Sequence, residues 1–197
     1  MKINEHTRII GKNVILIPYK ETHVQKYHGW MQSPELQHFT ASEPLTLEQE
    51  YAMQKSWRED EDKCTFIILD KSNFDITNNE TDAMIGDTNL FFNNSEDQSI
   101  AEAEIMIADN KSRGKKMGWE AMILMLRYGI EKLKVKRYEV KISMDNDKSI
   151  KMFNRLKFDE VIIIIFQEIT FAKEFTDDWL NWLISETSDA IRDENYE

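Results

Sequence analysis

A short segment rich in hydrogen-bond donors, residues 109–118, lies between an alternating apolar run and a helical pattern. It reads Asp-Asn-Lys-Ser-Arg-Gly-Lys-Lys-Met-Gly, so it contributes fixed positive charge and two glycines. Backbone N–H groups at the start of a helix bind anions, and glycine lets the backbone approach a phosphate closely. The spacing fits neither a Walker A loop nor a G-x-G-x-x-G dinucleotide loop. We therefore predict a phosphate site for a nucleotide cofactor at Arg113, Gly114, Lys115, Lys116, Met117 and Gly118.

Two carboxylates precede this loop at positions that could serve proton transfer. Glu102 and Glu104 lie two residues apart in the alternating run, so a strand would place both on one face, about 7 Å apart. A carboxylate near an amine removes a proton from it directly or through water. The alternative is that both side chains face solvent or pair with basic neighbours. Glu104 and Glu102 are the candidate catalytic bases.

A second motif follows at residues 146–158, Asn-Asp-Lys-Ser-Ile-Lys-Met-Phe-Asn-Arg-Leu-Lys-Phe. The two segments together resemble the GCN5-related N-acetyltransferase (GNAT) superfamily. Its signatures are Gln/Arg-x-x-Gly-x-Gly/Ala and Asn-x-x-Ser/Ala-x-x-x-Tyr/Phe-x-x-Leu-Gly-Phe, and two motifs at the expected separation are far more specific than one. Segments 11–19, 40–54 and 62–67 extend the resemblance over about residues 1–170. They point to a branch related to bacterial ribosomal-protein alanine acetyltransferases.

The resemblance implies transfer of an acetyl group from acetyl-CoA, used as a cosubstrate, to an amine. It implies that the loop wraps the pyrophosphate and that the preceding strand holds the pantetheine arm through its backbone. Asn146 would approach the same arm, although capping of the next helix explains this residue equally well. Phe153 stands where many relatives have a tyrosine that protonates the leaving thiolate, and core packing is its alternative role. The further cofactor-binding residues implied by the resemblance are Ile105, Met106, Ile107, Asn146, Ser149 and Phe153.

The chain departs from the family pattern at three positions. Lys116 replaces the inner glycine of the loop, and Lys157 replaces a later glycine. A left-handed backbone at a non-glycine residue costs about 1–2 kcal/mol, part of which an ammonium–phosphate pair would recover. Because Phe153 also lacks a hydroxyl, a second hypothesis stays open. It is a catalytically weak or inactive acyltransferase-fold module that acts by binding a protein partner.

The expected acceptor is an amine of a protein or peptide. Only the neutral amine attacks a thioester, so the pKa of the acceptor decides how much base catalysis is needed. An α-amino group with a pKa of about 7.7 is partly neutral at pH 7, whereas a lysine near 10.4 is almost fully charged. We therefore expect an α-amino group to be preferred over lysine.

Apolar periodicity predicts the elements that position these residues. Period-two or β-branched runs predict strands at 14–17, 66–69, 83–92, 102–108, 138–142 and 161–171, the last with a kink or bulge near 167–168. Period-3.6 patterns and caps predict helices over 24–31, from a capping box at 46–49 to the acidic cluster at 59–62, over 122–133, from 145 or 146 to 156, and from 176 or 177 to 183. Residues 71–82 are expected to form a polar loop.

This order of elements predicts an α/β (α+β) fold. With the resemblance, it implies a single GNAT-like domain with a mixed, mostly antiparallel central sheet and helices on both faces. The domain is expected to span residues 1–188, and the acidic end, residues 189–197, is expected to fray.

Composition and charge limit the function classes. The net charge of −11 opposes binding to nucleic acid or to an anionic membrane. The longest apolar run, residues 161–166, is far too short to span a bilayer, and the N-terminus lacks the apolar core of a secretory signal, so a cytoplasmic location is expected. With a single cysteine and no Cys/His cluster, no disulfide and no metal are expected. The oligomeric state stays open.

The charge is unevenly distributed along the chain. Residues 111–157 contain 14 Lys and Arg against 5 Asp and Glu, a local charge of +9, which leaves −20 for the other 150 residues. A solvated helix face balanced by acidic neighbours would explain this block. A site for a compact anion such as a nucleotide cofactor explains it as well, and the block coincides with both motifs.

Overall fold

The computed structural model describes residues 2–93, 97–165 and 167–196, with the side chains of residues 162–165 left out of the description. Within these residues nine strands form one sheet in the order β7-β8-β6-β5-β4-β3-β2-β1-β9. The strands are β1 (Arg8–Ile10), β2 (Val14–Pro18), β3 (Lys63–Asp70), β4 (Met84–Phe91), β5 (Ile100–Ile107), β6 (Arg137–Ser143), β7 (Asp159–Ile165), β8 (Glu168–Glu174) and β9 (Ile191–Asp193).

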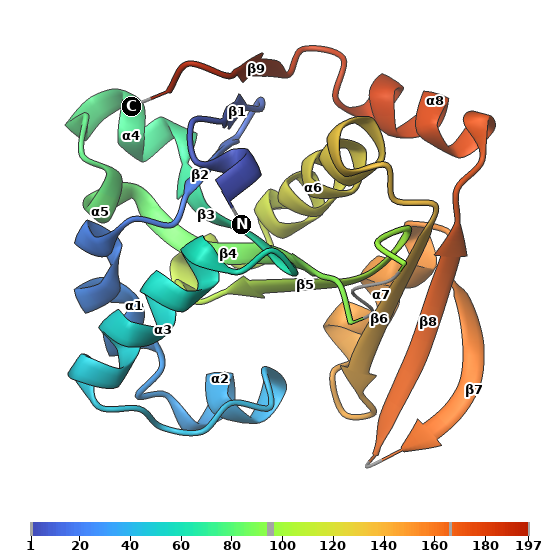
Figure 1. Ribbon diagram of the computed structural model, residues 1–197, viewed down its shortest axis with the longest axis horizontal. Coiled ribbons are helices and arrows are strands. Elements are labelled where there is room, and N and C mark those ends of the chain that lie inside the picture. The colour runs from blue at the N-terminus through green and yellow to red at the C-terminus, as the bar shows by residue number, and fades with distance from the viewer. Residues whose placement is uncertain (1, 94–96, 166, 197) are drawn as a thin grey trace.

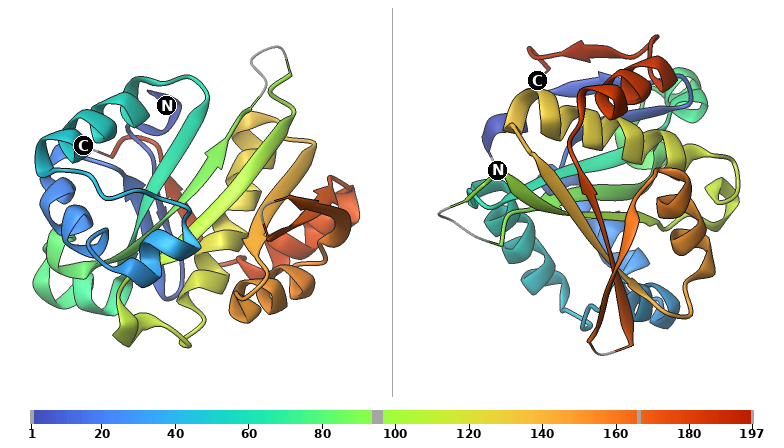
Figure 2. Two further views of the ribbon diagram at one scale, coloured as in Figure 1. Left: turned by 90° about the horizontal axis from the view of Figure 1, so that it is seen from below. Right: turned by 90° about the vertical axis from the view of Figure 1, so that its right-hand side faces the viewer.

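The helices lie between these strands along the chain. They are α1 (Val24–Trp30), α2 (Pro34–Phe39), α3 (Leu47–Glu59), α4 (Lys71–Thr77), α5 (Glu80–Ala83), α6 (Met117–Leu133), α7 (Asp147–Arg155) and α8 (Asp177–Glu186). Short 3₁₀ segments form at η1 (Lys2–Asn4), η2 (Glu21–His23) and η3 (Asn110–Ser112). Figure 2 shows helices on both sides of the sheet, so the predicted fold class is confirmed.

One strand pair sets the geometry of the candidate site. β5 and β6 are parallel and pair only through Ile100–Glu102 with Arg137–Glu139 among the described residues, whereas every other neighbouring pair in the sheet is antiparallel. Beyond these three pairs the two strands diverge, as Figure 1 shows. The far end of β5 therefore has β4 on one side and, in the part of the chain that the structure describes, no strand partner on the β6 side.

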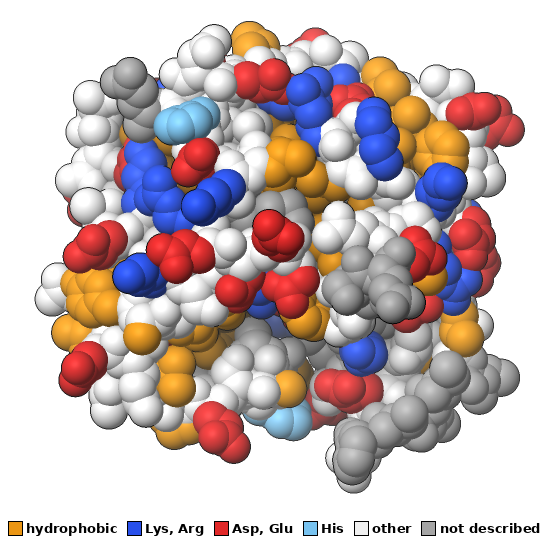
Figure 3. Space-filling view, viewed as in Figure 1, with side chains coloured by type: hydrophobic (Ala, Val, Ile, Leu, Met, Phe, Trp, Pro, Cys, Tyr) orange, Lys and Arg blue, Asp and Glu red, His pale blue; other side chains and the backbone are white. Residues whose placement is uncertain are grey.

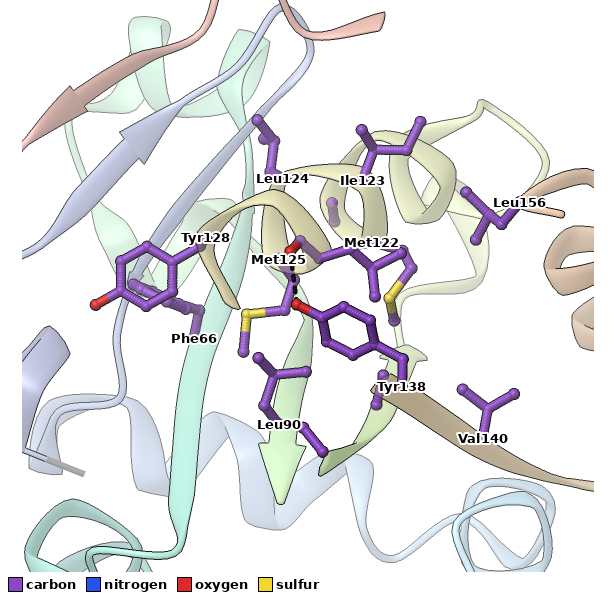
Figure 4. Close-up of a cluster of buried hydrophobic side chains, with 14 of the residues drawn as sticks. Phe66, Leu90, Met122, Ile123, Leu124, Met125, Tyr128, Tyr138, Val140 and Leu156 are labelled. Carbon is purple, nitrogen blue, oxygen red and sulfur yellow. Dashed lines mark hydrogen bonds between the residues drawn. The ribbon is translucent and has the colours of Figure 1, made fainter. Parts of the chain in front are cut away.

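Two apolar cores fill the two faces of the sheet. The larger core packs α6 and α8 against one face, and the smaller core packs α1 and α3 against the other. Tyr138 of β6 is fully buried in the larger core, and its hydroxyl donates a hydrogen bond of 2.7 Å to the carbonyl oxygen of Leu126 (Figure 4). A methyl group at Gly129 would collide with this hydroxyl, so a glycine is needed where α6 crosses β6.

Local signals account for several helix ends. The predicted capping box is confirmed: Gln49 N donates to Thr46 Oγ1 at 3.3 Å, and Thr46 N donates to Gln49 Oε1 at 2.9 Å. The polar loop expected at 71–82 is wrong, because Asp70 and Asn79 cap α4 and α5 there. Ser33 likewise caps α2, with Pro34 at its first turn, where only a helix end was expected.

The prediction of one long strand at 161–171 is also wrong, because this segment forms two antiparallel strands. The structure has a hairpin of β7 and β8 in place of a kinked strand: Ile165 pairs with Glu168, and Gln167 has a φ of 65°. Residue 166, part of that expected strand, lies outside the described residues. Gln167 is not a typical turn residue, so nothing local announces the reversal.

The C-terminal segment is more ordered than expected. β9 pairs antiparallel with β1, and Arg8 forms an ion pair of 2.9 Å with Asp193. Tyr196 N donates to the carbonyl oxygen of His6 at 2.9 Å. These contacts replace the fraying expected for this part of residues 189–197.

Candidate active site

The donor-rich loop connects the end of β5 to the start of α6. Asp109 begins η3 by accepting hydrogen bonds from Lys111 N and from the Ser112 hydroxyl, the latter at 2.6 Å. Gly114 and Lys116 then both adopt left-handed backbone conformations, with φ of 77° and 63°. Lys116, which replaces the inner glycine of the family pattern, therefore lies in the left-handed region that favours glycine.

The N-terminus of α6 carries no side-chain cap. Lys116 is the N-cap residue and makes no capping hydrogen bond, so the first backbone N–H groups of a 17-residue helix stay available for an anion. Lys115 and Lys116 are exposed beside it, and neither forms an ion pair with a described residue. This combination favours binding of a phosphate group.

Close packing sets the start of α6 against β5. A methyl group at Gly118 would lie 3.2 Å from Ile107 Cγ1, tighter than most contacts of that kind. Met117 is buried. The glycine therefore lets the helix start approach the last residues of β5, where the strand has no partner on its β6 side.

Arg113 does not extend freely into the loop as a phosphate ligand would. Its Nε donates a hydrogen bond of 2.8 Å to the carbonyl oxygen of Ile107, and its Nη1 pairs with Glu35 Oε1 at 3.1 Å. Glu35 lies on α2, which the sequence did not predict, so this partner was missed.

The two candidate bases share a face of β5, as period-two geometry predicts, and each pairs with a lysine. Glu102 Oε2 lies 2.7 Å from Lys141 Nζ, and Glu104 Oε2 lies 3.6 Å from Lys63 Nζ. The Glu104 side chain is 45% exposed and that of Glu102 is 14% exposed. Both carboxylates therefore pair with basic neighbours, which was the alternative to a catalytic role. Glu104 is the more accessible of the two.

The second motif forms the start and body of α7. Asn146 Oδ1 accepts a hydrogen bond of 3.1 Å from Ser149 N, which is the capping role considered for this residue. Phe153 is buried and packs edge to face against Phe158, with ring centroids 5.2 Å apart. Phe153 therefore packs in the core, which was the alternative to a role in the site. The helix that carries it, α7, lies behind the diverging strands in Figure 1.

A buried polar group on β4 was missed. Asp87 and Asn89 are each 3% exposed, and Asn89 Nδ2 donates to Asp87 Oδ2 at 2.7 Å. Thr65 donates to Asn89 Oδ1 at 2.6 Å. Burial raises the pKa of Asp87 to about 7, while the Asn89 hydrogen bond and the Lys63 charge lower it. The signal in the sequence was a run of three polar residues, Asp87, Thr88 and Asn89, in the middle of an apolar strand, of which the first and third share a face.

Comparison with known proteins identifies the family. The family model described as "Acetyltransferase (GNAT) domain" matches residues 13–159. The chain belongs to the GNAT acetyltransferase family. This confirms the resemblance inferred from the two motifs, and it makes the protein an acetyltransferase by family.

Relatives of high identity belong to the N-acetyltransferase 9 branch. The "N-acetyltransferase 9-like protein" of Nematostella vectensis is 53% identical over 172 residues, 86% of this chain and 87% of that protein. The human protein named "Alpha/beta-tubulin-N-acetyltransferase 9" is 47% identical over 192 residues, 95% of this chain and 93% of that protein. Segments 11–19, 40–54 and 62–67 had indicated this branch.

Solved structures support the same fold. A chimera of the Vibrio cholerae spermidine N-acetyltransferase SpeG with hSSAT matches with a TM-score of 0.69 at 16% identity, covering 86% of this chain and 99% of the other. Among the described residues of the GNAT chain, no group of three or more His, Cys, Asp or Glu could hold a metal ion. The same residues include no helix long and apolar enough to cross a membrane.

Proposed function

We propose that this GNAT protein transfers the acetyl group of acetyl-CoA to an amine of a protein or peptide, with an α-amino group preferred over lysine. The observation that carries the proposal is the meeting of three features: the unpaired end of β5, the uncapped N-terminus of α6, and exposed Lys115 and Lys116 beside it. Each suits one part of a phosphorylated, amide-bearing cosubstrate.

The residues present fit acetyl-CoA. The backbone N–H groups of Met117 and Gly118, with the two exposed lysines, would bind the pyrophosphate. The backbone of Ile105–Ile107 would pair with the amides of the pantetheine arm, and Arg113 would have to leave the Ile107 carbonyl to join the phosphates. When bound, acetyl-CoA supplies an activated acetyl group, and the chain's part is to place an amine beside it.

Glu104 is the better candidate to meet that amine. Its side chain is more exposed than that of Glu102, and its 3.6 Å ion pair with Lys63 is longer than the 2.7 Å pair of Glu102 with Lys141. A longer, partly exposed ion pair is easier to open. Figure 3 shows acidic side chains gathered near the middle of the same face, in front of β4 and β5, which favours approach of a cationic amine.

The names of the relatives suggest a first acceptor. The human protein is named an alpha/beta-tubulin N-acetyltransferase, and we propose the free N-terminus of a tubulin subunit as the first acceptor to test for this chain. Cytoplasmic action, as expected from the sequence, is part of this proposal.

Mass spectrometry of peptides incubated with the protein and acetyl-CoA tests the proposal. Each peptide is offered with a free α-amino group, with a chemically blocked α-amino group, and with lysine replaced by arginine. We expect acetylation of the first and third sets and little of the second. Acetylation of blocked peptides at lysine would contradict the α-amino preference, and acetyl-CoA binding without thiol release from any set would favour the binding-module hypothesis.

The buried ring of Phe153 is the observation that keeps this second hypothesis in view. It offers no hydroxyl to protonate a leaving thiolate. A thiol with a pKa near 8.5 is nevertheless a tolerable anionic leaving group, so the lack of a tyrosine hydroxyl slows transfer rather than preventing it.

A further inference from the structure

Two neighbouring strands, β3 and β4, bring a chain of oriented polar groups under α1 and α3. The hydroxyl of Thr65 on β3 donates to Asn89 Oδ1, and Asn89 Nδ2 in turn donates to Asp87 Oδ2. Both ends of the Asn89 amide are thus occupied, which fixes its orientation and that of the Asp87 carboxyl. The second oxygen, Asp87 Oδ1, is buried and has no hydrogen-bond partner among the described residues.

The register places Asp87 beside the proposed site of transfer. Asp87 lies opposite Met106 in the antiparallel β4–β5 pair, and Asn89 lies opposite Glu104. Asp87 and Glu104 are therefore diagonal neighbours on one face, with backbone positions about 7 Å apart, a spacing within reach of a long side chain such as that of Glu104. Glu104 meets solvent at this point, whereas Asp87 is closed off behind it.

Groups from every neighbouring element act on the Asp87 carboxyl. The charge of Lys63 on β3 and the hydrogen bond from Asn89 favour the ionised form, Tyr27 on α1 lies close to the same carboxyl, and the charge of Glu104 on β5 disfavours ionisation. Tyr19 follows β2 and Glu50 lies on α3, and each has a buried oxygen without a hydrogen-bond partner in the described chain. His28 of α1 occupies the other Glu50 oxygen at 3.3 Å.

We propose that Asp87 is the final acceptor of the proton that the acceptor amine gives up, with Glu104 as the carboxylate that the amine meets first. This inference rests on the proposed function and names a residue that acts through Glu104. The division follows from burial, since two nearby carboxyls in unlike environments take different protonation roles.

Acetyl transfer from the thioester to an ammonium group releases one proton in total. The acceptor ammonium gives one proton to Glu104 and becomes a neutral amine. Glu104 then passes the proton on to the Asp87 carboxylate. The amine nitrogen attacks the thioester carbon, the C–N bond forms, the C–S bond breaks, and the second amine proton goes to the departing sulfur as the thiol. Asp87 then returns its proton to water. Ammonium and thioester have become amide, thiol and one released proton.

The test compares the pH dependence of steady-state kinetics in wild type, Asp87→Asn and Glu104→Gln, with an α-amino peptide as acceptor. We expect D87N to lower kcat by 100-fold or more, to leave the KM for acetyl-CoA within threefold, and to remove an ionisation near pH 7 from the kcat profile. E104Q, which interrupts the route of the proton to Asp87, is expected to lower kcat by 100-fold or more as well and to raise the KM for the peptide. Asp75→Asn, which removes an exposed carboxylate on α4, is the matched control.

Each other outcome has a fixed meaning. A D87N protein with kcat within threefold of wild type, or with an unchanged profile, overturns the inference and leaves the proposed function standing. A wild-type protein that transfers no acetyl group overturns both. If D87N does not fold, Thr65→Val removes the hydroxyl that orients Asn89 and leaves Asp87 in place. The inference then requires the kcat ionisation to move by about 0.5 pH unit or more, and an unmoved profile overturns it.

Discussion

Arg113 Nε donates a hydrogen bond of 2.8 Å to the carbonyl oxygen of Ile107, so the loop before α6 is tied back onto the end of β5. The same guanidinium pairs with Glu35 of α2. Arg113 therefore holds loop, sheet and α2 together in this conformation. Lys115 and Lys116 are exposed and have no ion-pair partner among the described residues, so both are cations of the loop that face solvent.

Reversing both lysine charges should weaken acetyl-CoA binding without disturbing the fold. For Lys115→Glu with Lys116→Glu we expect a loss of affinity of about tenfold or more at low ionic strength, and a smaller dependence of affinity on salt, because the exposed cations near the phosphates are gone. Calorimetric titration measures both. Lys2→Glu with Lys55→Glu changes the net charge equally on η1 and α3. If this control weakens binding as much, the loop is not the phosphate site.

Replacing Lys116 by glycine separates backbone strain from charge. Lys116→Gly relieves the strain of a left-handed non-glycine residue and should raise the free energy of unfolding by about 1 kcal/mol. Because this strain is already present in the free protein, acetyl-CoA affinity should change only through the lost charge, by less than about tenfold. Lys134→Gly at the other end of α6 is the matched control, since Lys134 also has a left-handed φ of 62°. It should give a similar gain in urea denaturation and unchanged binding. A hundredfold gain in affinity for K116G would instead mean that the lysine obstructs the cosubstrate.

The buried carboxyl should make stability fall as pH rises. Because the pKa of Asp87 is about 7 in the folded state and about 3.9 when unfolded, the folded state binds the extra proton between these values. The contribution of this proton to the free energy of unfolding is fully present below pH 4 and is lost as pH rises through 7. Above pH 8, the free energy of unfolding of D87N should therefore exceed that of wild type by as much as about 4 kcal/mol, measured by urea denaturation. Near pH 4 the difference should be much smaller. Equal differences at pH 4.5 and pH 8.5 would show that Asp87 does not titrate in this range.

Removing residues 189–197 should cost stability. The deletion takes away β9 and the ion pair between Arg8 and Asp193, and it leaves β1 as an open sheet edge. We expect a loss of about 1–3 kcal/mol in the free energy of unfolding and a greater tendency to associate, measured by urea denaturation and light scattering. Asp193→Asn, which removes the charge and keeps the strand, should cost less than half as much. An unchanged midpoint for the deletion would return this segment to the frayed end expected from the sequence.

Local patterns predicted the elements whose signals are local. The apolar stripe of α6 and the capping box at Thr46 and Gln49 are properties of one helix each, and both were found as expected. The alternation of β5 correctly placed Glu102 and Glu104 on one face. The loop motif located the start of α6, because strand, glycines and helix are contiguous there.

Features that depend on distant residues were missed. The partners of Arg113 and Glu104, namely Glu35 and Lys63, come from other elements, and no local pattern reveals such pairs. Burial of Asp87 depends on α1 and α3 covering the sheet. β9 exists only because β1 offers an edge 181 residues earlier, at Ile10 opposite Ile191.

The three residue pairs between β5 and β6 have a consequence for the cooperativity of unfolding. Few backbone hydrogen bonds join the β1–β5 part of the sheet to the β6–β8 part, so these parts are separate candidates for sub-global opening. A cosubstrate whose amides pair with both free edges would act as a removable strand and merge two unfolding units into one. Amide hydrogen exchange should then slow on both sides of the divergence at once, in proportion to ligand occupancy rather than to distance from the phosphates.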